Sequence, residues 1–228
     1  MAWNTDETKR RLKQAAVEEF SSFGLAGARV DRIAERAGIN KERIYGYFGN
    51  KEQLFATVLR DELSQAAEAV PMAMKTSEDI AQIAGHAFDY HEAHLHFARL
   101  LHWEALAYGE NPVPDEQGRG QYYQDKVSAF SAAQDRALIA STPDADQLVF
   151  MVLALAAWWF AVPQVARMLS GPITDPQAER ARRRAAVVEA ARRLADPAHE
   201  TPAGLDRRVK RAPVGVRRDA DAGEQVLA

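Results

Sequence analysis

The stretch from Val30 to Phe48 constrains this chain most, because its pattern predicts two short helices separated by one tight turn. The first half carries apolar residues at helical spacing, namely Val30, Ile33, Ala34 and Ala37. Gly38 follows at once, and glycine readily adopts the left-handed conformation that ends a helix. Asn40 can then cap a second helix with its side-chain oxygen.

The second of these helices has two different faces. Ile44 and Phe48 lie four residues apart and predict a buried face. The other face presents Lys41, Arg43, Tyr45 and Tyr47. A small residue between the helices, a glycine in the turn and polar or aromatic groups facing outward are typical of a helix-turn-helix. An ordinary helical hairpin has the same periodicity, so these residues alone leave both interpretations open.

The flanking sequence favours the helix-turn-helix. Characteristic residues recur at fixed spacing: Ala15, Ala16, Phe20, Gly24, Val30, Ile33, Ala34, Ala37, Gly38, Ile44, Tyr45, Tyr47, Phe48, Lys51, Glu52 and Leu54. On these positions, the run from Thr5 to about Leu63 resembles the DNA-binding domain of the TetR family of transcriptional regulators. The resemblance implies an all-α fold, with an N-terminal three-helix DNA-binding domain and a C-terminal helical domain for ligand binding and dimerisation.

The charge is unevenly distributed along the chain. The net charge of −3 over 228 residues looks unsuited to nucleic acid. However, residues 1–55 hold ten Lys and Arg against eight Asp and Glu, whereas residues 56–170 hold seven against fifteen. The approach of a protein to DNA depends on its local electrostatic potential and not on its net charge. We therefore expect the N-terminal part to approach phosphates and the acidic middle to face away from DNA.

Composition excludes several kinds of site. The chain has no cysteine, which excludes disulfides, thiolate catalysis and cysteine-bound zinc. The first residues have no apolar core of the kind that a signal peptide requires, and we expect a cytoplasmic protein.

The resemblance implies specific DNA contacts. Tyr45 and Tyr47 are expected to donate hydrogen bonds to phosphates, and Lys41 and Arg43 to reach bases or phosphates. Arg43 is the preferred base reader, because arginine can bind guanine through two hydrogen bonds. Gly46 leaves room for close approach of the backbone to DNA.

Five further cations near the motif are candidates for phosphate contact. Arg29 stands where relatives usually place a capping Ser or Thr, so the helix from Val30 is expected either to start slightly differently or to depend on Asp31 in its first turn. Arg29 is instead placed to reach a phosphate. Lys51 follows Asn50, which caps the next helix, and can meet a phosphate beside the positive end of the helix dipole. Lys9 lies on the exposed face of the first helix with Arg10 and Lys13, where either phosphate contact or simple solvation fits.

The first helix is expected to bury Leu12, Ala16, Phe20 and Phe23 and to end at Gly24. Beyond the motif, periodicity predicts a helix up to Val70, ended by Pro71, and helical structure over residues 77–108 with a break between His91 and His96. Residues 111–120 are expected to form a loop, followed by a helix carrying Tyr122 to Leu138. Thr142 and Pro143 predict the cap and first residue of the next helix.

Five histidines fall between positions 86 and 102, but they do not share one helical stripe and form no HExxH motif. We expect ordinary helical histidines and no metal or other cofactor. A cavity for a flat or apolar ligand is expected from aromatic side chains, with plain core packing as the alternative. The candidate ligand-binding residues are Phe88, His102, Trp103, Tyr122, Tyr123 and Phe130, with Tyr108 as a further aromatic.

The run from Leu148 to Val162 has no polar side chain. It is shorter than the roughly 20 residues of a membrane span, so we expect no membrane contact. One face is expected to pack on the domain and the other on a second copy of the chain. The last helix should begin at Asp175-Pro176, with four arginines on its solvated side: Arg180, Arg182, Arg183 and Arg184. By resemblance, the last two helices of two subunits form a four-helix bundle.

These observations predict three segments: a DNA-binding domain at 5–65, a ligand-binding and dimerisation domain at 66–197, and a flexible tail at 198–228. The predicted function is a homodimeric repressor that a small-molecule effector releases from a double-stranded DNA operator. An activator, or a DNA-binding regulator without a ligand, stays open as the alternative. A helical enzyme is a remote one, because no nucleophile is paired with a base and no phosphate-binding glycine loop is present.

Overall fold

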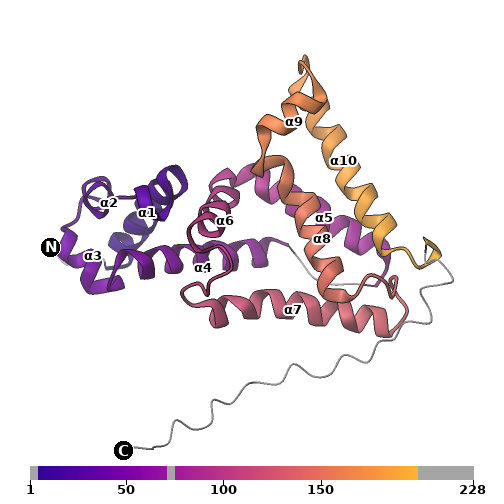
Figure 1. Ribbon diagram of the computed structural model, residues 1–228, viewed down its shortest axis with the longest axis horizontal. Coiled ribbons are helices and arrows are strands. Elements are labelled where there is room, and N and C mark those ends of the chain that lie inside the picture. The colour runs from indigo at the N-terminus through magenta and orange to yellow at the C-terminus, as the bar shows by residue number, and fades with distance from the viewer. Residues whose placement is uncertain (1–4, 71–74, 200–228) are drawn as a thin grey trace, which may run out of the picture.

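The computed structural model describes residues 5–70 and 75–199. These residues form ten α-helices, one short 3₁₀ helix and no strand, in agreement with the predicted all-α class (Figure 1). The helices are α1 (Thr5–Gly27), α2 (Val30–Ala37), α3 (Lys41–Phe48), α4 (Lys51–Ala69), α5 (Ser77–Ala93), α6 (Leu95–Tyr108), α7 (Glu116–Asp135), α8 (Ala145–Ala161), α9 (Pro163–Ser170) and α10 (Pro176–Ala195), followed by the 3₁₀ helix Pro197–His199.

The first three helices gather at one end of the molecule, and α4 runs from them into the second group of helices (Figure 1). The N-terminal core includes Phe20 of α1 and Phe55 of α4, whose rings meet edge to face with centroids 5.0 Å apart. Ile33 of α2 and Ile44 of α3 are fully buried in the same core. One prediction was wrong: Phe23 is 48% exposed, because the chain kinks at Gly24 (φ 67°) and the Phe23 ring lies on the surface under the Arg32 guanidinium.

The predicted helix ends are confirmed where a single glycine or capping side chain sets the end of the helix. Gly38 adopts φ 66° and ψ 39°, and its N–H bonds back into α2. The Asn40 side chain accepts a hydrogen bond from the Glu42 N–H at 2.9 Å, and Asn50 accepts from the Gln53 N–H at 2.8 Å. These caps satisfy backbone donors that have no partner inside the helix.

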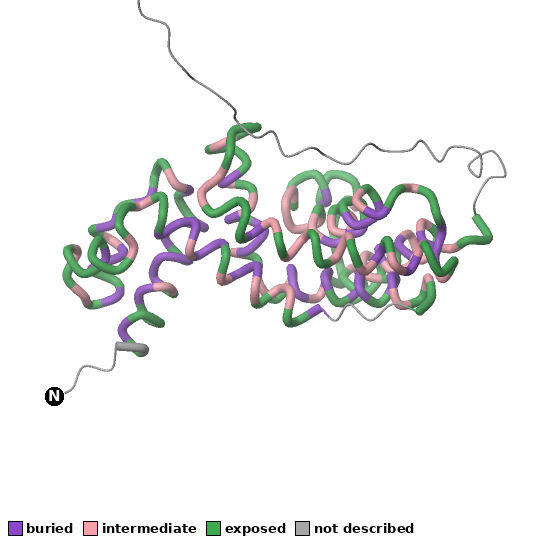
Figure 2. The backbone as a smooth tube through the Cα atoms, turned by 90° about the horizontal axis from the view of Figure 1, so that it is seen from below, coloured by how far each residue is buried: buried purple, intermediate pink, exposed green. Residues whose placement is uncertain are grey.

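The second core lies among α5, α7, α8 and α10. Phe88 of α5, Phe130 of α7 and Leu148 of α8 are buried there, and α10 lies along α5. Buried positions lie inside both groups of helices (Figure 2). Leu54 and Phe55 of α4 lie in the N-terminal core, and Val70, which directly follows α4, lies in the second core.

Two loops were placed wrongly. α7 begins at Glu116, so the loop expected over 111–120 ends earlier and Gly118 and Gly120 are helical, because Arg119 is held inside by Glu104 of α6 at 2.5 Å. At its other end α7 stops at Asp135, which leaves Leu138 outside the helix.

The start of α8 and the existence of α9 were also missed. α8 begins at Ala145 after Asp144, so Pro143 is not its first residue. The Gln134 side-chain amide donates to the carbonyls of Ala140 and Pro143 at 2.9 and 2.8 Å and holds this segment outside the helix. The eight-residue α9 was not predicted.

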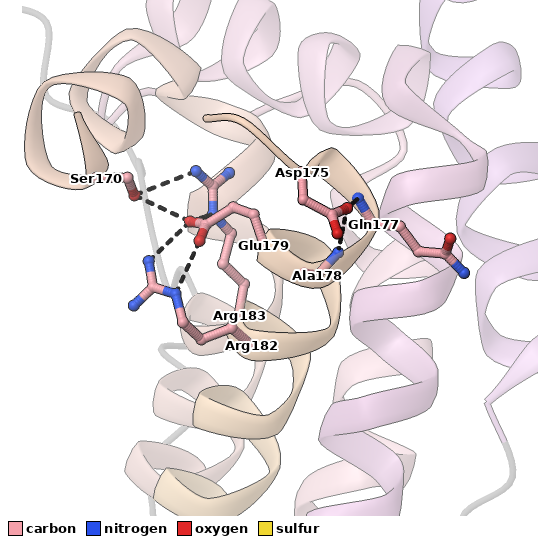
Figure 3. Close-up of polar contacts among 7 residues, drawn as sticks. All are labelled: Ser170, Asp175, Gln177, Ala178, Glu179, Arg182 and Arg183. Carbon is pink, nitrogen blue, oxygen red and sulfur yellow. Dashed lines mark hydrogen bonds and ion pairs between the residues drawn. The ribbon is translucent and has the colours of Figure 1, made fainter. Parts of the chain in front are cut away.

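The last helix begins as predicted, with the Asp175 carboxylate accepting from the N–H groups of Gln177 and Ala178 (Figure 3). Its arginines are not simply solvated, which corrects the expectation. Arg180 and Arg184 both form ion pairs with Asp89 of α5 at 2.9 Å. The tail expected from residue 198 falls almost entirely outside the described residues.

α8 has one buried and one exposed face. Leu148, Val152 and Ala156 pack inward, whereas Phe150 is 73% and Trp158 59% exposed. Among the described helices, no single one is long and apolar enough to cross a membrane. The α8–α9 pair reaches that length and composition only across an 82° bend.

Candidate functional sites

The outward face of α3 carries the predicted DNA contacts. Tyr45 and Tyr47 are 41% and 42% exposed, and Arg43 and Gly46 are also exposed. A Cβ at Gly46 would meet no heavy atom within 4 Å. Lys9 of α1 extends the same surface, with its Nζ 5.8 Å from the centre of the Tyr47 ring.

Two predicted phosphate ligands already have partners in this structure. Lys41 Nζ lies 2.7 Å from an Asp31 carboxylate oxygen, and this hydrogen bond raises the pKa of Lys41 and lowers that of Asp31. Lys51 Nζ donates weakly to the Ala28 carbonyl at 3.4 Å, which ties the start of α4 to the turn before α2. Arg10 and Lys13 are paired with Glu7 and Asp61, so of the three α1 cations Lys9 lies nearest to the α3 surface.

The start of α2 depends on a residue that the sequence analysis missed. Arg29 is exposed and caps nothing with its side chain, but its N–H donates to the buried Glu19 carboxylate at 2.9 Å. Arg32 Nε donates to the same oxygen at 2.8 Å. Burial alone would raise the pKa of Glu19, but these hydrogen bonds outweigh it and hold the pKa below its usual value. The signal was present, because Glu19 lies on the apolar face of α1, three residues after Ala16 and seven after Leu12.

A cavity of about 130 Å³ lies among α4, α5, α6, α7 and α8. Its wall is mainly apolar, with Leu63 and Ala66 from α4, Phe97 and Leu101 from α6 and Val152 from α8. Of the candidate ligand residues, the structure places Tyr122, Tyr123 and Phe130 in this wall.

The other three candidates lie outside the lining. Phe88 is a core residue whose ring centroid is 5.0 Å from that of Phe160. His102 is partly exposed, and its Nδ1 bonds the carbonyl of Ala98 in the same helix. The Trp103 indole N–H donates to the Ser21 carbonyl at 3.2 Å, which joins α6 to α1. The further aromatic Tyr108 packs against the N-terminal core.

Three polar residues in the cavity wall were not among the predicted ligand contacts. The Tyr90 hydroxyl and His91 Nδ1 are buried and have no hydrogen-bond partner among the described residues. Burial raises the pKa of Tyr90 to about 12 and lowers that of His91 to about 4, so both are neutral at pH 7. Lys126 is half-buried, and desolvation lowers its pKa. Helical spacing could have found Lys126, which lies three and four residues after the two tyrosines.

The histidines do not gather around a common point. His91 stacks between Phe97 and Phe160, and His96 Nε2 lies 2.7 Å from a Glu62 oxygen. Within residues 5–70 and 75–199, no group of three His, Asp or Glu side chains could hold a metal ion.

Comparison with known proteins identifies the family. Residues 12–58 match the family described as bacterial regulatory proteins, tetR family. Residues 79–193 match the tetracyclin repressor-like C-terminal domain. The chain belongs to the TetR family. The two matches fall on the α1–α4 unit and on the helices from α5 to α10.

Individual proteins of similar sequence or structure support membership of the TetR family. The chain is 42% identical over 170 residues to the HTH-type transcriptional repressor SCO4008 of Streptomyces coelicolor, covering 75% of this chain and 87% of that protein. The solved structure of SCO4942 from the same organism has a TM-score of 0.70 at 31% identity, covering 82% and 98% of the two chains. FadR of Bacillus subtilis, solved with stearoyl-CoA, has a TM-score of 0.60 at 16% identity over 80% and 97%, which is a likeness of fold alone.

This TetR-family member is therefore a DNA-binding transcriptional regulator and not an enzyme. The α2–α3 pair is its helix-turn-helix, as the sequence predicted.

Proposed function

We propose that this protein is a homodimeric repressor that leaves its DNA operator when a small molecule fills the cavity. One observation carries the proposal: α4 holds the DNA-reading helices at its first half and lines the cavity at its second. Leu54 and Phe55 pack into the α1–α3 core, whereas Leu63, Ala66 and Ala67 form cavity wall. The proposed domains are 5–65 for DNA and 66–197 for ligand and dimer, with 198–228 as a tail.

The coupling requires a ligand that prefers one position of α4 over another. A ligand with equal affinity for both states would shift nothing. Filling the cavity against Leu63 and Ala66 favours a displaced α4, and α4 carries Lys51 and the N-terminal core with it. The distance between the α3 helices of the two subunits would then no longer match the spacing of successive major grooves.

A second connection runs through α6, which also lines the cavity. Arg99 Nε and the Trp103 indole N–H both donate to the Ser21 carbonyl of α1, at 2.8 and 3.2 Å. The Trp103 ring also covers Gly24, where a Cβ would come within 2.6 Å of it. A ligand that moves Phe97 and Leu101 would therefore displace α1 as well as α4.

The proposed DNA contacts follow from the exposed α3 surface. Tyr45 and Tyr47 bond phosphates, Arg43 reads a base edge, and Gly46 allows close approach. Lys41 exchanges Asp31 for a phosphate, which is electrostatically favourable because DNA presents several anionic groups at once. Arg29 and Lys51 contact the backbone at the rims of the groove.

The proposed dimer uses the exposed face of α8 together with α10. Phe150, Ala154 and Trp158 are spaced by four residues and share this exposed face. α9 adds the exposed Met168 and Leu169. The α9–α10 corner is held by Glu179, which bonds Ser170, Arg182 and Arg183 (Figure 3). Exposed apolar surface of this kind is typical of protein–protein contact.

Two further points support a ligand-released repressor. The relative SCO4008 is named as a repressor, and FadR of the same fold was solved with a small-molecule ligand. An activator would bind DNA through the same α3 surface, so the direction of regulation is decided by transcription and not by binding.

The test uses the full chain and DNA from the region upstream of its own gene. Footprinting locates the operator, and fluorescence anisotropy then measures affinity with and without candidate effectors. We expect nanomolar binding at physiological salt, and a compound that binds the cavity should weaken it. A cavity-filling variant, Ala66→Phe, should weaken operator binding without any compound, whereas the solvent-facing Gln65→Phe on the same helix should not. Unchanged binding by Ala66→Phe, with the fold retained, would contradict the coupling.

A further inference from the structure

The cavity wall carries charge of one sign only, and this indicates the chemistry of its ligand. Of the described residues in its wall, Lys126 alone carries a charge at pH 7, and none is acidic. Resting on the proposed function, we propose that the effector is an apolar molecule with a single anionic group, a carboxylate or its equivalent, which Lys126 binds.

Lys126 has no direct ion-pair partner among the described residues, and the charge of the neighbouring Asp125 compensates its burial only in part, so that its pKa stays lowered. Its Nζ reaches the Tyr122 carbonyl only weakly, at 3.4 Å, and no ion pair among the described residues includes it. Partial burial of an ammonium group costs free energy unless an anion compensates. A carboxylate at the cavity mouth would supply that compensation through a charge-assisted hydrogen bond.

Two residues of the wall each carry a buried polar atom without a partner in the protein. Tyr90 Oη and His91 Nδ1 both belong to wall residues that are more than nine-tenths buried, and neither has a protein partner. Buried polar atoms without partners are rare in native proteins. Because both side chains are neutral at pH 7, they add no second charge to the wall.

Apart from the hydroxyls of Tyr122 and Tyr123, the remaining wall is apolar and disfavours strongly polar ligands. Leu63, Ile83, Phe97, Val149 and Leu153 offer no hydrogen bonds, so the body of the ligand has to be aliphatic or aromatic. A cationic ligand would place its charge beside Lys126 with no described acidic wall residue to compensate, which is unfavourable.

The test separates charge from shape by using two sets of three compounds. Octanoate, octanamide and octylamine share an aliphatic body, and phenylacetate, phenylacetamide and phenethylamine share an aromatic one. Titration calorimetry with the full chain and no DNA measures each dissociation constant. We expect a carboxylate to bind roughly tenfold or more tightly than its amide, the scale of a hydrogen bond to a charged group, and the amines to bind more weakly still.

Variants then assign the preference to one side chain. Lys126→Met should weaken carboxylate binding roughly ten- to a hundredfold and leave amide binding nearly unchanged, whereas Lys126→Arg should retain the preference. Lys75→Met removes the same charge from an exposed position outside the cavity wall and should change neither. The proposal is overturned if amines or amides bind as tightly as carboxylates, if Lys126→Met keeps the preference, or if no compound of either set binds at millimolar concentration.

This experiment can fail separately from the proposed function. A carboxylate that binds through Lys126 but does not change operator affinity leaves the ligand class standing and contradicts release. A neutral compound that enters the cavity and releases the operator supports release and contradicts the ligand class.

Discussion

Glu104 of α6 and Arg119 of α7 form a buried ion pair with two hydrogen bonds, at 2.5 and 2.6 Å. Burial alone would lower the pKa of Arg119, but the hydrogen bonds from its guanidinium to Glu104 more than reverse this and raise it. The pair joins two helices that line the cavity, and it turns the first residues of α7 into helix where glycines and prolines favoured a loop.

Removing the charge of one partner of the Glu104–Arg119 pair should strongly destabilise the fold. Glu104→Gln leaves the Arg119 charge buried without a carboxylate, so we expect the free energy of unfolding to fall by about 3 to 5 kcal/mol, measured by urea denaturation. Glu7→Gln breaks the exposed Glu7–Arg10 pair and serves as the control, with little or no expected loss because water screens the pair. Equal losses in the two variants would show that burial adds nothing to the pair.

Substitution of glycine by alanine should have opposite effects on stability at two positions. Gly24→Ala introduces a Cβ within 2.6 Å of the Trp103 ring at a positive φ, so we expect destabilisation by about 2 kcal/mol or more from overpacking and backbone strain. Gly46→Ala meets open space inside α3 and should stabilise by about 0.5 to 1 kcal/mol. Thermal unfolding measures both. If Gly46→Ala stabilises the fold but weakens operator binding, the expected close approach of α3 to DNA is supported.

Arg43 and Tyr47 should have different effects on DNA binding. Arg43→Ala removes the proposed base contact, so discrimination between operator and random DNA should fall by about 1 to 3 kcal/mol. Tyr47→Phe removes only the hydroxyl and should weaken binding to both DNAs nearly equally, because phosphate contacts carry no sequence information. Anisotropy titrations of the wild type and both variants with each DNA, at a fixed salt concentration, give the six affinities. Unchanged discrimination by Arg43→Ala would remove Arg43 as the base reader.

The oligomeric state tests the exposed face of α8. Phe150→Glu places a charge in the centre of the proposed dimer contact, and we expect a monomer of about half the mass by sedimentation. Leu106→Glu is the matched control, because Leu106 is 77% exposed on α6 and outside the proposed contact. A wild-type monomer, or a dimer that tolerates Phe150→Glu, would contradict the proposed interface.

His91 should make stability depend on pH. Its folded pKa of about 4 lies below its ordinary value near 6.5, so between these values the unfolded chain binds the additional proton. The stabilisation is complete above pH 6.5 and is lost as pH falls towards 4, by up to about 3 kcal/mol. His91→Phe keeps the stacking with Phe97 and removes the titration, so its denaturation midpoints between pH 7 and 4 should fall less than those of the wild type. Parallel curves would show that His91 does not titrate in this way.

Local signals sufficed for the turn and the helix caps of the N-terminal unit. Gly38, Asn40 and Asn50 act through their own backbone or the next few residues, so the turn and both caps could be predicted without knowing what lies nearby. The apolar face of α2 follows from spacing alone, because a helix places residues three and four apart on one side, whereas the apolar run of α8 did not show which of its faces is buried. Family membership followed from the same short-range pattern.

The rest was decided by contacts between residues far apart in the chain. Phe88 and Phe130 are both aromatic and both buried, yet only the packing of α5, α7 and α8 placed Phe130 in the cavity wall and Phe88 in the core. Glu19 became the support of α2, and Arg119 became helical, because a partner from another helix compensated their burial. Composition and periodicity thus determined the all-α class and most of the helices, but not α9 or the burial of Phe23. Only the tertiary structure decided which side chains surround the cavity, since that depends on how five helices meet.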